Sequence, residues 1–383
     1  MDPKPQDPSP DLSPSTTIPP SPSAQEPAHD VTLAPRPNTF FFGRFGLRAG
    51  WSITIFVVIV AIIVAFSGFF SVAATGQLKE MIAARAQAHA HPQAPRPTVP
   101  FQPMLVIVND GLTFLGMLGL CWFFSRGERR RLGVYGIGTS RRSDFFPGAF
   151  WGLVALSALV LLLHSLHLLY FDARLLTGTA VFLYAVKWLL AFLLVGFSEE
   201  YMLRGYLQFT LTRGVFGLAQ KISPNHARLA AFWIAAVIMS FAFGALHLAN
   251  TGENPLGIGQ VVLFGLIFSY TLWRTGSLWW GIGFHMAWDW AQSFLYGVPD
   301  SGNLSVGRLF QTHTAGTPLL SGGVDGPEGS VLCIPIFLLA ILVLCFTSPS
   351  LQPPLELPGD PDFSSRLDHS PIPHLPDTDS AAA

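Results

Sequence analysis

Residues 189–204 read LLAFLLVGFSEEYMLR, a stretch that is typical of a membrane helix. Its first part, 189–197, is an uninterrupted apolar run of the kind that spans membranes as a helix. The run leads almost directly into Glu199 and Glu200, and Arg204 follows one helical turn later. An ionisable side chain at membrane depth costs roughly 2.5–3.5 kcal/mol, so it is a functional candidate by default. We therefore predict a membrane helix whose apolar run ends in functional polar residues.

The composition of the 383-residue chain supports the same fold class. Apolar residues make up 50% of it and charged residues 12%, whereas a soluble domain typically carries about 25% charged residues. The formal net charge of −1 provides no basic surface for a nucleic acid. The three cysteines (Cys121, Cys333 and Cys345) lie in apolar runs without the spacing of a disulfide framework or a zinc cluster. The sequence predicts an all-α, polytopic membrane protein without a nucleic-acid partner.

Apolar segments and basic loops predict how the helices are arranged in the membrane. A bilayer core needs about 20 helical residues. Eight segments approach this length: 51–74, 104–124, 150–170, 180–197, 229–248, 258–273, 278–295 and 331–346. The loop between the second and third segments holds the densest group of arginines: Arg126, Arg129, Arg130, Arg131, Arg141 and Arg142. Because short basic loops stay in the cytoplasm, we expect a multi-pass protein of the cell membrane with both termini cytoplasmic.

Three polar clusters interrupt the apolar segments in the second half of the chain. In the first, Glu200 and Arg204 lie on one helical face at i and i+4, where they can form an ion pair, while Glu199 points about 100° away. The alternative is a helix end that reaches interfacial water, where Glu and Arg are ordinary. In the second cluster, His247 follows Phe243 by four residues near the end of a span. A lone histidine at that place is also consistent with a structural role.

The third cluster is the hardest to explain by packing. His285 and Asp289 occupy positions i and i+4 inside the segment 278–295 and project from one helical face. An aspartate in mid-span needs a proton, a partner or a cavity. Two other histidines, His164 and His167, lie near the outer end of the third segment, and we interpret them as interfacial. The remaining polar residues of the predicted spans can pair or reach the interface; they are Asn109, Asp110 and Lys187.

Together the three clusters could supply one polar pocket. Such a set can hydrolyse a peptide bond, with a carboxylate as general base on water, a histidine that protonates the leaving amine and further donors for the oxyanion. A zinc site made of His247, His285 and a glutamate is an alternative, although the sequence contains no HExxH motif.

The order of these motifs resembles that of the CPBP family, which includes the type II CAAX prenyl proteases and lysostaphin-resistance-like proteins. The family pattern is Glu-Glu-x-x-x-Arg, then Phe-x-x-x-His, then His-x-x-x-Asn or Asp, on successive membrane helices. This sequence supplies all three in that order, as Glu199-Glu200-x-x-x-Arg204, Phe243-x-x-x-His247 and His285-x-x-x-Asp289. The resemblance extends over residues 180–295, which is under a third of the chain.

The resemblance implies an intramembrane endopeptidase that cleaves without a covalent intermediate. Dependence on a metal stays open, and we favour a mechanism without a cofactor over one with zinc. Glu199 would activate the water, and Glu200 would assist or orient Glu199. His247 would hold the water or polarise the pair of glutamates. His285 and Asp289 would stabilise the oxyanion. Asn is the commoner family residue at the last position, and an ionised Asp cannot donate a hydrogen bond. Asp289 is therefore either protonated or orients His285. The catalytic set implied for this chain is Glu199, Glu200, Arg204, His247, His285 and Asp289.

The sequence predicts that the chain divides into six parts. They are a disordered cytoplasmic segment (1–48), three transmembrane helices with a basic loop (49–178), a CAAX-protease-like core (179–298), a Gly-rich extracytoplasmic loop (299–329), a last transmembrane helix (330–347) and a disordered tail (348–383). The implied partners are a membrane-associated protein or peptide as substrate, and the lipid bilayer. Two other functions stay open: a transporter that uses the buried acids and histidines as a proton relay, and a non-catalytic scaffold or immunity-type protein.

The predicted depths of Glu199 and His247 in the membrane conflict with a common site. With straight spans, Glu199 lies near the cytoplasmic end of its helix and His247 near the outer end of the next. A rise of about 1.5 Å per residue then keeps them apart. We expect the helix of Glu199 to continue through Arg204 to about Leu211 and to tilt, which places Glu199 in mid-membrane. The alternative is that the polar clusters form no common site.

Overall fold

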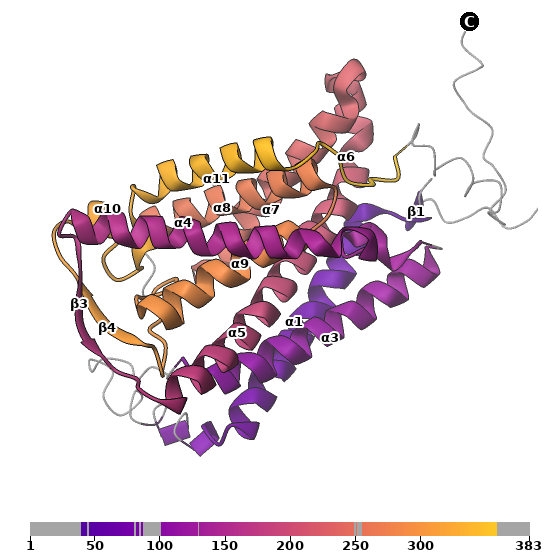
Figure 1. Cartoon of the computed structure of the whole chain (residues 1–383). Helices are drawn as coiled ribbons and strands as arrows, with labels where there is room; N and C mark the ends of the chain where they lie inside the picture. The colour runs from indigo at the N-terminus through magenta and orange to yellow at the C-terminus, as the bar shows by residue number, and fades with distance from the viewer. Residues whose placement is uncertain are drawn as a thin grey trace, which may run out of the picture. The chain divides into compact units, whose positions relative to one another are not determined.

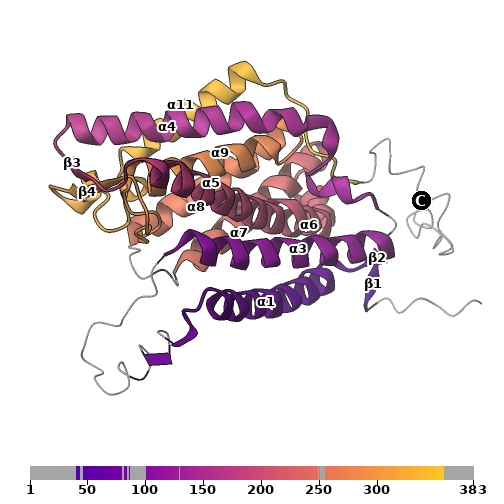
Figure 2. The ribbon, with the colours of Figure 1, turned by 60° about the horizontal axis from the view of Figure 1, so that its bottom comes forward.

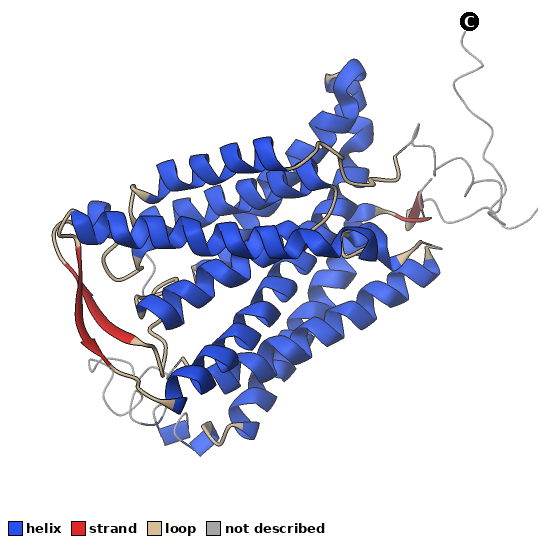
Figure 3. Ribbon diagram, viewed as in Figure 1, coloured by secondary structure: helices blue, strands red, loops and turns tan. Residues whose placement is uncertain are grey.

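The computed structural model describes residues 40–43, 46–79, 82–83, 86, 101–128, 130–248, 250 and 255–357. These residues form helices together with two short pairs of antiparallel strands (Figure 3). The helical, polytopic fold class predicted from the sequence is confirmed. The predicted disordered tails, 1–48 and 348–383, lie for the most part outside the described residues.

The long helices of the described residues are α1 (Ala49–Ala74), α3 (Pro103–Gly127), α4 (Phe145–Ser165), α5 (Thr179–Glu200), α6 (Gln208–Ile222), α7 (Ala227–His247), α8 (Pro255–Thr275), α9 (Trp279–Trp290) and α11 (Cys333–Thr347) (Figure 1). Short helical segments are η1 (Leu132–Tyr135), η2 (Thr139–Asp144), η4 (Pro224–His226), α10 (Pro318–Ser321), η6 (Pro327–Gly329) and the π-helical η3 (Tyr201–Leu207) and η5 (Ala291–Tyr296). The strands are β1 (Phe42–Gly43), β2 (Gly46–Leu47), β3 (Leu169–Arg174) and β4 (Phe310–Thr314).

Six segments of the described residues are long and apolar enough to cross a membrane: Ala49–Ala74, Pro103–Gly127, Leu132–Ser165, Thr179–Ile222, Pro224–His247 and Pro255–Thr275. The predicted spans 278–295 and 331–346 are also helical, but α9 has 12 residues and α11 has 15. α9 continues into η5, and its polar His285 and Asp289 lower the hydropathy of that segment. The multi-pass character is therefore confirmed, whereas the number of eight crossings stays a prediction.

The helix that carries the two glutamates is much longer than the predicted 180–197. α5, η3 and α6 form one helical segment from Thr179 to Ile222. Glu199 and Glu200 therefore lie near its middle, and the helix continues beyond Leu211, where we expected it to end. The wide turns of η3 begin directly after Glu200, and π-helical turns occur frequently at functional sites.

Close contacts between α4 and α9 fix the helix that carries His285. A Cβ atom added at Gly148 or Gly152 of α4 would lie 2.1 Å or 2.3 Å from the backbone oxygens of Trp280 and Phe284, respectively. Small residues such as glycine are what allow helix backbones to approach closely in membranes. α9 also packs against α5, so it lies between α4 and the helix of the glutamates (Figure 1 and Figure 2).

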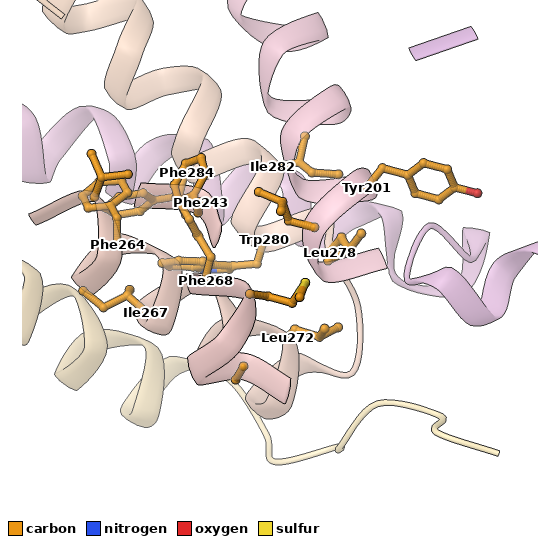
Figure 4. Close-up of a cluster of buried hydrophobic side chains, with 14 of the residues drawn as sticks. Tyr201, Phe243, Phe264, Ile267, Phe268, Leu272, Leu278, Trp280, Ile282 and Phe284 are labelled. Carbon is orange, nitrogen blue, oxygen red and sulfur yellow. The ribbon is translucent and has the colours of Figure 1, made fainter. Parts of the chain in front are cut away.

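Aromatic side chains form the packed core beside these polar residues. Figure 4 shows Phe243 of α7, Phe268 of α8 and Phe284 of α9 in one cluster of buried side chains. The ring centroids of Phe268 and Phe284 are 6.1 Å apart in an edge-to-face arrangement. Each buried aromatic ring removes about 150–250 Å² from solvent, so this cluster holds α7, α8 and α9 firmly together.

The predicted Gly-rich loop 299–329 contains regular structure. Its strand β4 pairs antiparallel with β3, which follows α4. The third predicted span, 150–170, is shifted accordingly, because α4 ends at Ser165 and Leu169 begins β3. His167 adopts a positive φ of 58° just after α4. The apolar run of the sequence continues through this change from helix to strand, so hydropathy alone did not reveal it.

The first part of the predicted disordered tail, 348–357, packs against the core. Leu355 and Leu357 are buried, and the Glu356 carboxylate lies 3.0 Å from the Arg130 guanidinium. Two leucines and one ion pair anchor a stretch whose Pro-rich composition suggested disorder. The expectation of disorder is therefore corrected for these residues.

Candidate functional site

The polar clusters meet at one cavity of about 340 Å³, to which α3, α5, α7, α8 and α9 contribute. Four of the six predicted site residues line it: Glu199, His247, His285 and Asp289. Glu200 and Arg204 do not line it and are buried beside it. The long continuous helix brings Glu199 to the same cavity as His247, which removes the conflict of depth.

Glu200 and Arg204 form a buried ion pair. The Arg204 guanidinium donates to Glu200 Oε1 at 3.0 Å, and both side chains are 0% exposed. The guanidinium also lies over the rings of Phe243 and Phe268, at 4.4 Å and 5.5 Å from their centroids. These aromatic faces supply a cation–π contact in place of water. The sequence-based expectation of this i, i+4 pair is confirmed.

His285 connects the buried pair to the cavity. Its Nδ1 lies 3.1 Å from Glu200 Oε1, and its Nε2 lies 3.4 Å from Asp289 Oδ2 and 3.8 Å from Glu199 Oε2. The ring stacks on Phe268 with 5.1 Å between centroids. Both ring nitrogens face carboxylate oxygens, so the ring is held among the side chains of Glu199, Glu200 and Asp289.

Glu199 and His247 present the accessible polar atoms. The Glu199 side chain is 30% exposed, whereas the Glu200 side chain is 0% exposed. The Nδ1 of His247 lies 3.0 Å from the backbone oxygen of Phe243, one turn earlier in α7. When Nδ1 donates to that oxygen, Nε2 keeps a lone pair that can accept a hydrogen bond. Glu199 and His247 can therefore offer a carboxylate and an imidazole to a water molecule in the cavity.

Three further carboxylates line the cavity that were not among the predicted site residues: Asp110, Asp300 and Glu328. Asp110 could have been predicted as a site residue from the sequence, because it is an ionisable residue inside an apolar segment, as Asp289 is. Its backbone oxygen accepts a hydrogen bond from Ser198 at 3.1 Å, which joins α3 to α5. Asp300 and Glu328 gave no such signal, since they lie in a polar loop.

Hydrogen bonds connect this loop to the cavity wall. Ser293 of η5 donates to Asp300 Oδ2 at 2.8 Å, and the backbone N–H of Ser301 donates to Glu328 Oε1. Burial, together with the nearby charge of Asp300, raises the pKa of Glu328 to about 8. The loop 299–329 is thus part of the site rather than a separate connection.

Other candidates lie away from the cavity. His164 does not line it, and its Nδ1 lies 3.0 Å from the backbone oxygen of Leu169. The Lys187 ammonium lies over the ring of Tyr184 at 5.4 Å. Among the described residues, no three side chains of His, Cys, Asp or Glu are grouped so that they could hold a metal ion.

Residues 180–291 match the family model of type II CAAX prenyl endopeptidase Rce1-like proteins. This range contains all six predicted site residues, and the resemblance drawn from their motifs is confirmed. The family is one of proteases, which supports a CAAX-type membrane protease in general terms. Neither the curated proteins nor the solved structures contain a match to the chain.

Proposed function

We propose that this protein, whose residues 180–291 match the Rce1-like family model, is an intramembrane endopeptidase that hydrolyses a peptide bond of a membrane-associated protein or peptide. Water adds its oxygen to the carbonyl carbon, the C–N bond breaks, and a proton is delivered to the leaving amine. No covalent bond to the enzyme forms in this scheme. The protein would act in the cell membrane, with both termini in the cytoplasm.

Glu199 is the proposed general base. A general base must reach the proton that it removes, directly or through one water, and the Glu199 side chain is partly exposed at the cavity. It takes a proton from the attacking water and passes it to the leaving nitrogen. The imidazole of His247, at the same cavity, holds the water through Nε2.

His285 is the proposed donor to the oxyanion. Glu200 fixes the ring through Nδ1, and Asp289 lies beside Nε2. A protonated imidazole with fixed orientation stabilises the negative charge that develops on the carbonyl oxygen. In this arrangement Glu200, Arg204 and Asp289 position His285, and Asp289 has no need to donate a hydrogen bond itself.

One observation carries the proposal: a partly exposed glutamate and a histidine held by a buried ion pair approach within 3.8 Å at a cavity among apolar helices. The cavity, of about 340 Å³, has room for water beside these two side chains. Charge-stabilising groups are worth more there than in water.

The experiment compares the purified protein in detergent with Glu199→Gln and His285→Ala on a library of fluorogenic peptides, with and without a strong zinc chelator. Asp144→Asn and His164→Ala are the matched controls, because neither residue lines the cavity. We expect both site variants to lose at least about a hundredfold in cleavage rate, while the controls cleave like the wild type.

The chelator and the controls separate the alternatives. Wild-type cleavage that survives the chelator agrees with the proposal, whereas cleavage lost to the chelator would make His247 and His285 metal ligands. Undiminished cleavage by Glu199→Gln contradicts the role of Glu199. If no peptide in the library is cleaved by the wild type, the non-catalytic scaffold becomes the better interpretation.

A further inference from the structure

The loop 299–329 brings acids to the cavity that the catalytic scheme does not use. Two ionisable residues of this loop line the cavity, and both are acids: Asp300 and Glu328. Among the described residues that line the cavity there is neither a lysine nor an arginine. A carboxylate that is taken out of water needs a proton or a cation to offset the cost of its charge. These acids therefore raise the question of which group they meet when the cavity is occupied.

The backbone of the loop holds the two acids beside each other. The N–H of Ser301 donates to Glu328 Oε1, which joins the residue after Asp300 to the second acid. Gly326 has a positive φ of 98°, and a Cβ atom added to it would lie 2.0 Å from the backbone oxygen of Pro299. Only glycine permits this approach of two parts of the loop. The acids thus belong to a preformed wall of the cavity.

A buried amide points to a ligand independently of the acids. Gln260 of α8 lines the cavity and is 4% exposed. Its amide nitrogen donates to the backbone oxygen of Ser330 at 3.1 Å, and Ser330 directly follows η6, the segment of Glu328. Gln260 Oε1 has no hydrogen-bond partner within the part of the chain that the structure describes. Buried polar atoms almost always have a partner, so this oxygen calls for a donor.

The electrostatic surroundings of Glu328 call for a positive group. Burial and the nearby charges of Asp300 and Asp325 raise the pKa of Glu328 to about 8. The charged side chains that act on this carboxyl within the described residues are thus acids. A bound cation would favour the ionised carboxylate and take the place of its proton. A ligand that carries positive charge and only donors fits both Glu328 and Gln260 Oε1.

We propose that the loop side of the cavity is a subsite for a basic residue of the substrate, whose ammonium or guanidinium group donates to Glu328 and to Gln260 Oε1. Lysine and arginine side chains carry donors and no acceptor. This inference rests on the proposed endopeptidase function and names its substrate class, a membrane-associated peptide with a basic residue near the scissile bond. A metal ion fits less well, because the described residues contain no group of three side chains that could hold one.

The size of the cavity limits how far the basic residue lies from the scissile bond. Its volume of about 340 Å³ is at the lower end of the range of about 300–1,000 Å³ for ligand pockets. Glu199 and His285 line this same cavity. The basic residue and the bond that is cleaved therefore lie within a few residues of each other in the substrate.

The test uses the full-length protein in detergent at about pH 8, close to the pKa of Glu328. Peptides of one sequence carry Lys, Gln, Met or Glu at a single position, which is moved along the chain. Fluorescence anisotropy gives Kd without any need for cleavage, and fluorogenic versions give kcat/KM. The variants are Glu328→Gln and Gln260→Leu. Asp172→Asn is the matched control, because it neutralises a carboxylate of β3 that pairs with His313 and does not line the cavity.

We expect the wild type to bind the Lys peptide about tenfold more tightly than the Gln peptide at one position, as a charge-assisted hydrogen bond provides. Glu328→Gln should bind the two peptides almost equally, and Gln260→Leu should show a reduced preference. Asp172→Asn should keep the wild-type preference. For peptides that are cleaved, the loss should appear in KM more than in kcat, because the subsite holds the substrate and does not touch the reacting atoms.

Two results would overturn the subsite even if peptides are cleaved. One is equal affinity of the wild type for Lys, Gln and Met peptides at every position, and the other is a Lys preference that persists in Glu328→Gln. A Lys preference in binding that depends on Glu328, without cleavage, supports the subsite and counts against the endopeptidase. Melting temperatures show whether each variant is folded, and the wild-type peptide comparison decides even where a variant is not.

Discussion

Glu199 and Glu200 are neighbours in the sequence, yet the two faces of their helix place them in opposite surroundings. Glu200 is sealed from solvent and bonded to both Arg204 and His285. Glu199 is 30% exposed and lines the cavity. The difference shows how one motif can supply two functions: one carboxylate that builds the site and one that is available to react with water.

The largest effect is expected for Glu200→Gln, which should harm folding as well as activity. It leaves the buried Arg204 without its ion-pair partner, and breaking a buried pair costs about 3–5 kcal/mol. Thermal unfolding in detergent should show a melting temperature well below that of the wild type, alongside loss of cleavage. Glu199→Gln, the same change one residue earlier, should keep the wild-type melting temperature. If both variants melt alike, the two glutamates do not differ as the structure indicates.

A smaller effect is expected for Asp289→Asn, which tests the carboxylate that faces His285 Nε2 at 3.4 Å. Asn keeps an oxygen that can accept from the ring, so we expect kcat to fall by about tenfold or less. Kinetics with the best peptide from the library, over a range of pH, provide the measurement. A loss as large as that of Glu199→Gln would show that the negative charge of Asp289 is required in the reaction.

The smallest effect concerns the loop, and it is a dependence on pH. The raised pKa of Glu328, about 8, means that the folded state holds a proton that the unfolded chain releases above its ordinary pKa of 4.5. Stability from this group is present at low pH and is lost as pH rises towards 8. The melting temperature of the wild type should therefore fall by a few degrees between about pH 6 and pH 9.

Glu328→Gln removes this titration while it keeps an acceptor for the Ser301 N–H. The melting temperature of the variant should change less with pH than that of the wild type. At the alkaline end the variant should melt at a higher temperature than the wild type. His313→Gln serves as a control, because His313 pairs with Asp172 on the strand pair rather than at the cavity. A wild-type profile that is unchanged in Glu328→Gln would assign the pH dependence to another group.

Much of the membrane fold and of the candidate site could be predicted from local patterns. Apolar runs located the helices, and the i, i+4 spacing located the Glu200–Arg204 pair. The segment 299–329 could not be predicted in this way, because its place at the site depends on tertiary contacts such as the hydrogen bonds from Ser293 to Asp300 and from Ser301 to Glu328. Asp300 and Glu328 were missed for that reason.

Local composition was enough to identify the residues that lipid-facing packing does not explain, because the cost of placing a charge in a membrane depends on the apolar residues around it. Which of these residues meet depends on how the helices pack. α4 and α9 approach through glycines, a continuous helix carries Glu199 to the cavity, and a distant loop adds two more acids. Long-range contacts of this kind depend on the shapes of packed helices, which no short stretch of sequence contains.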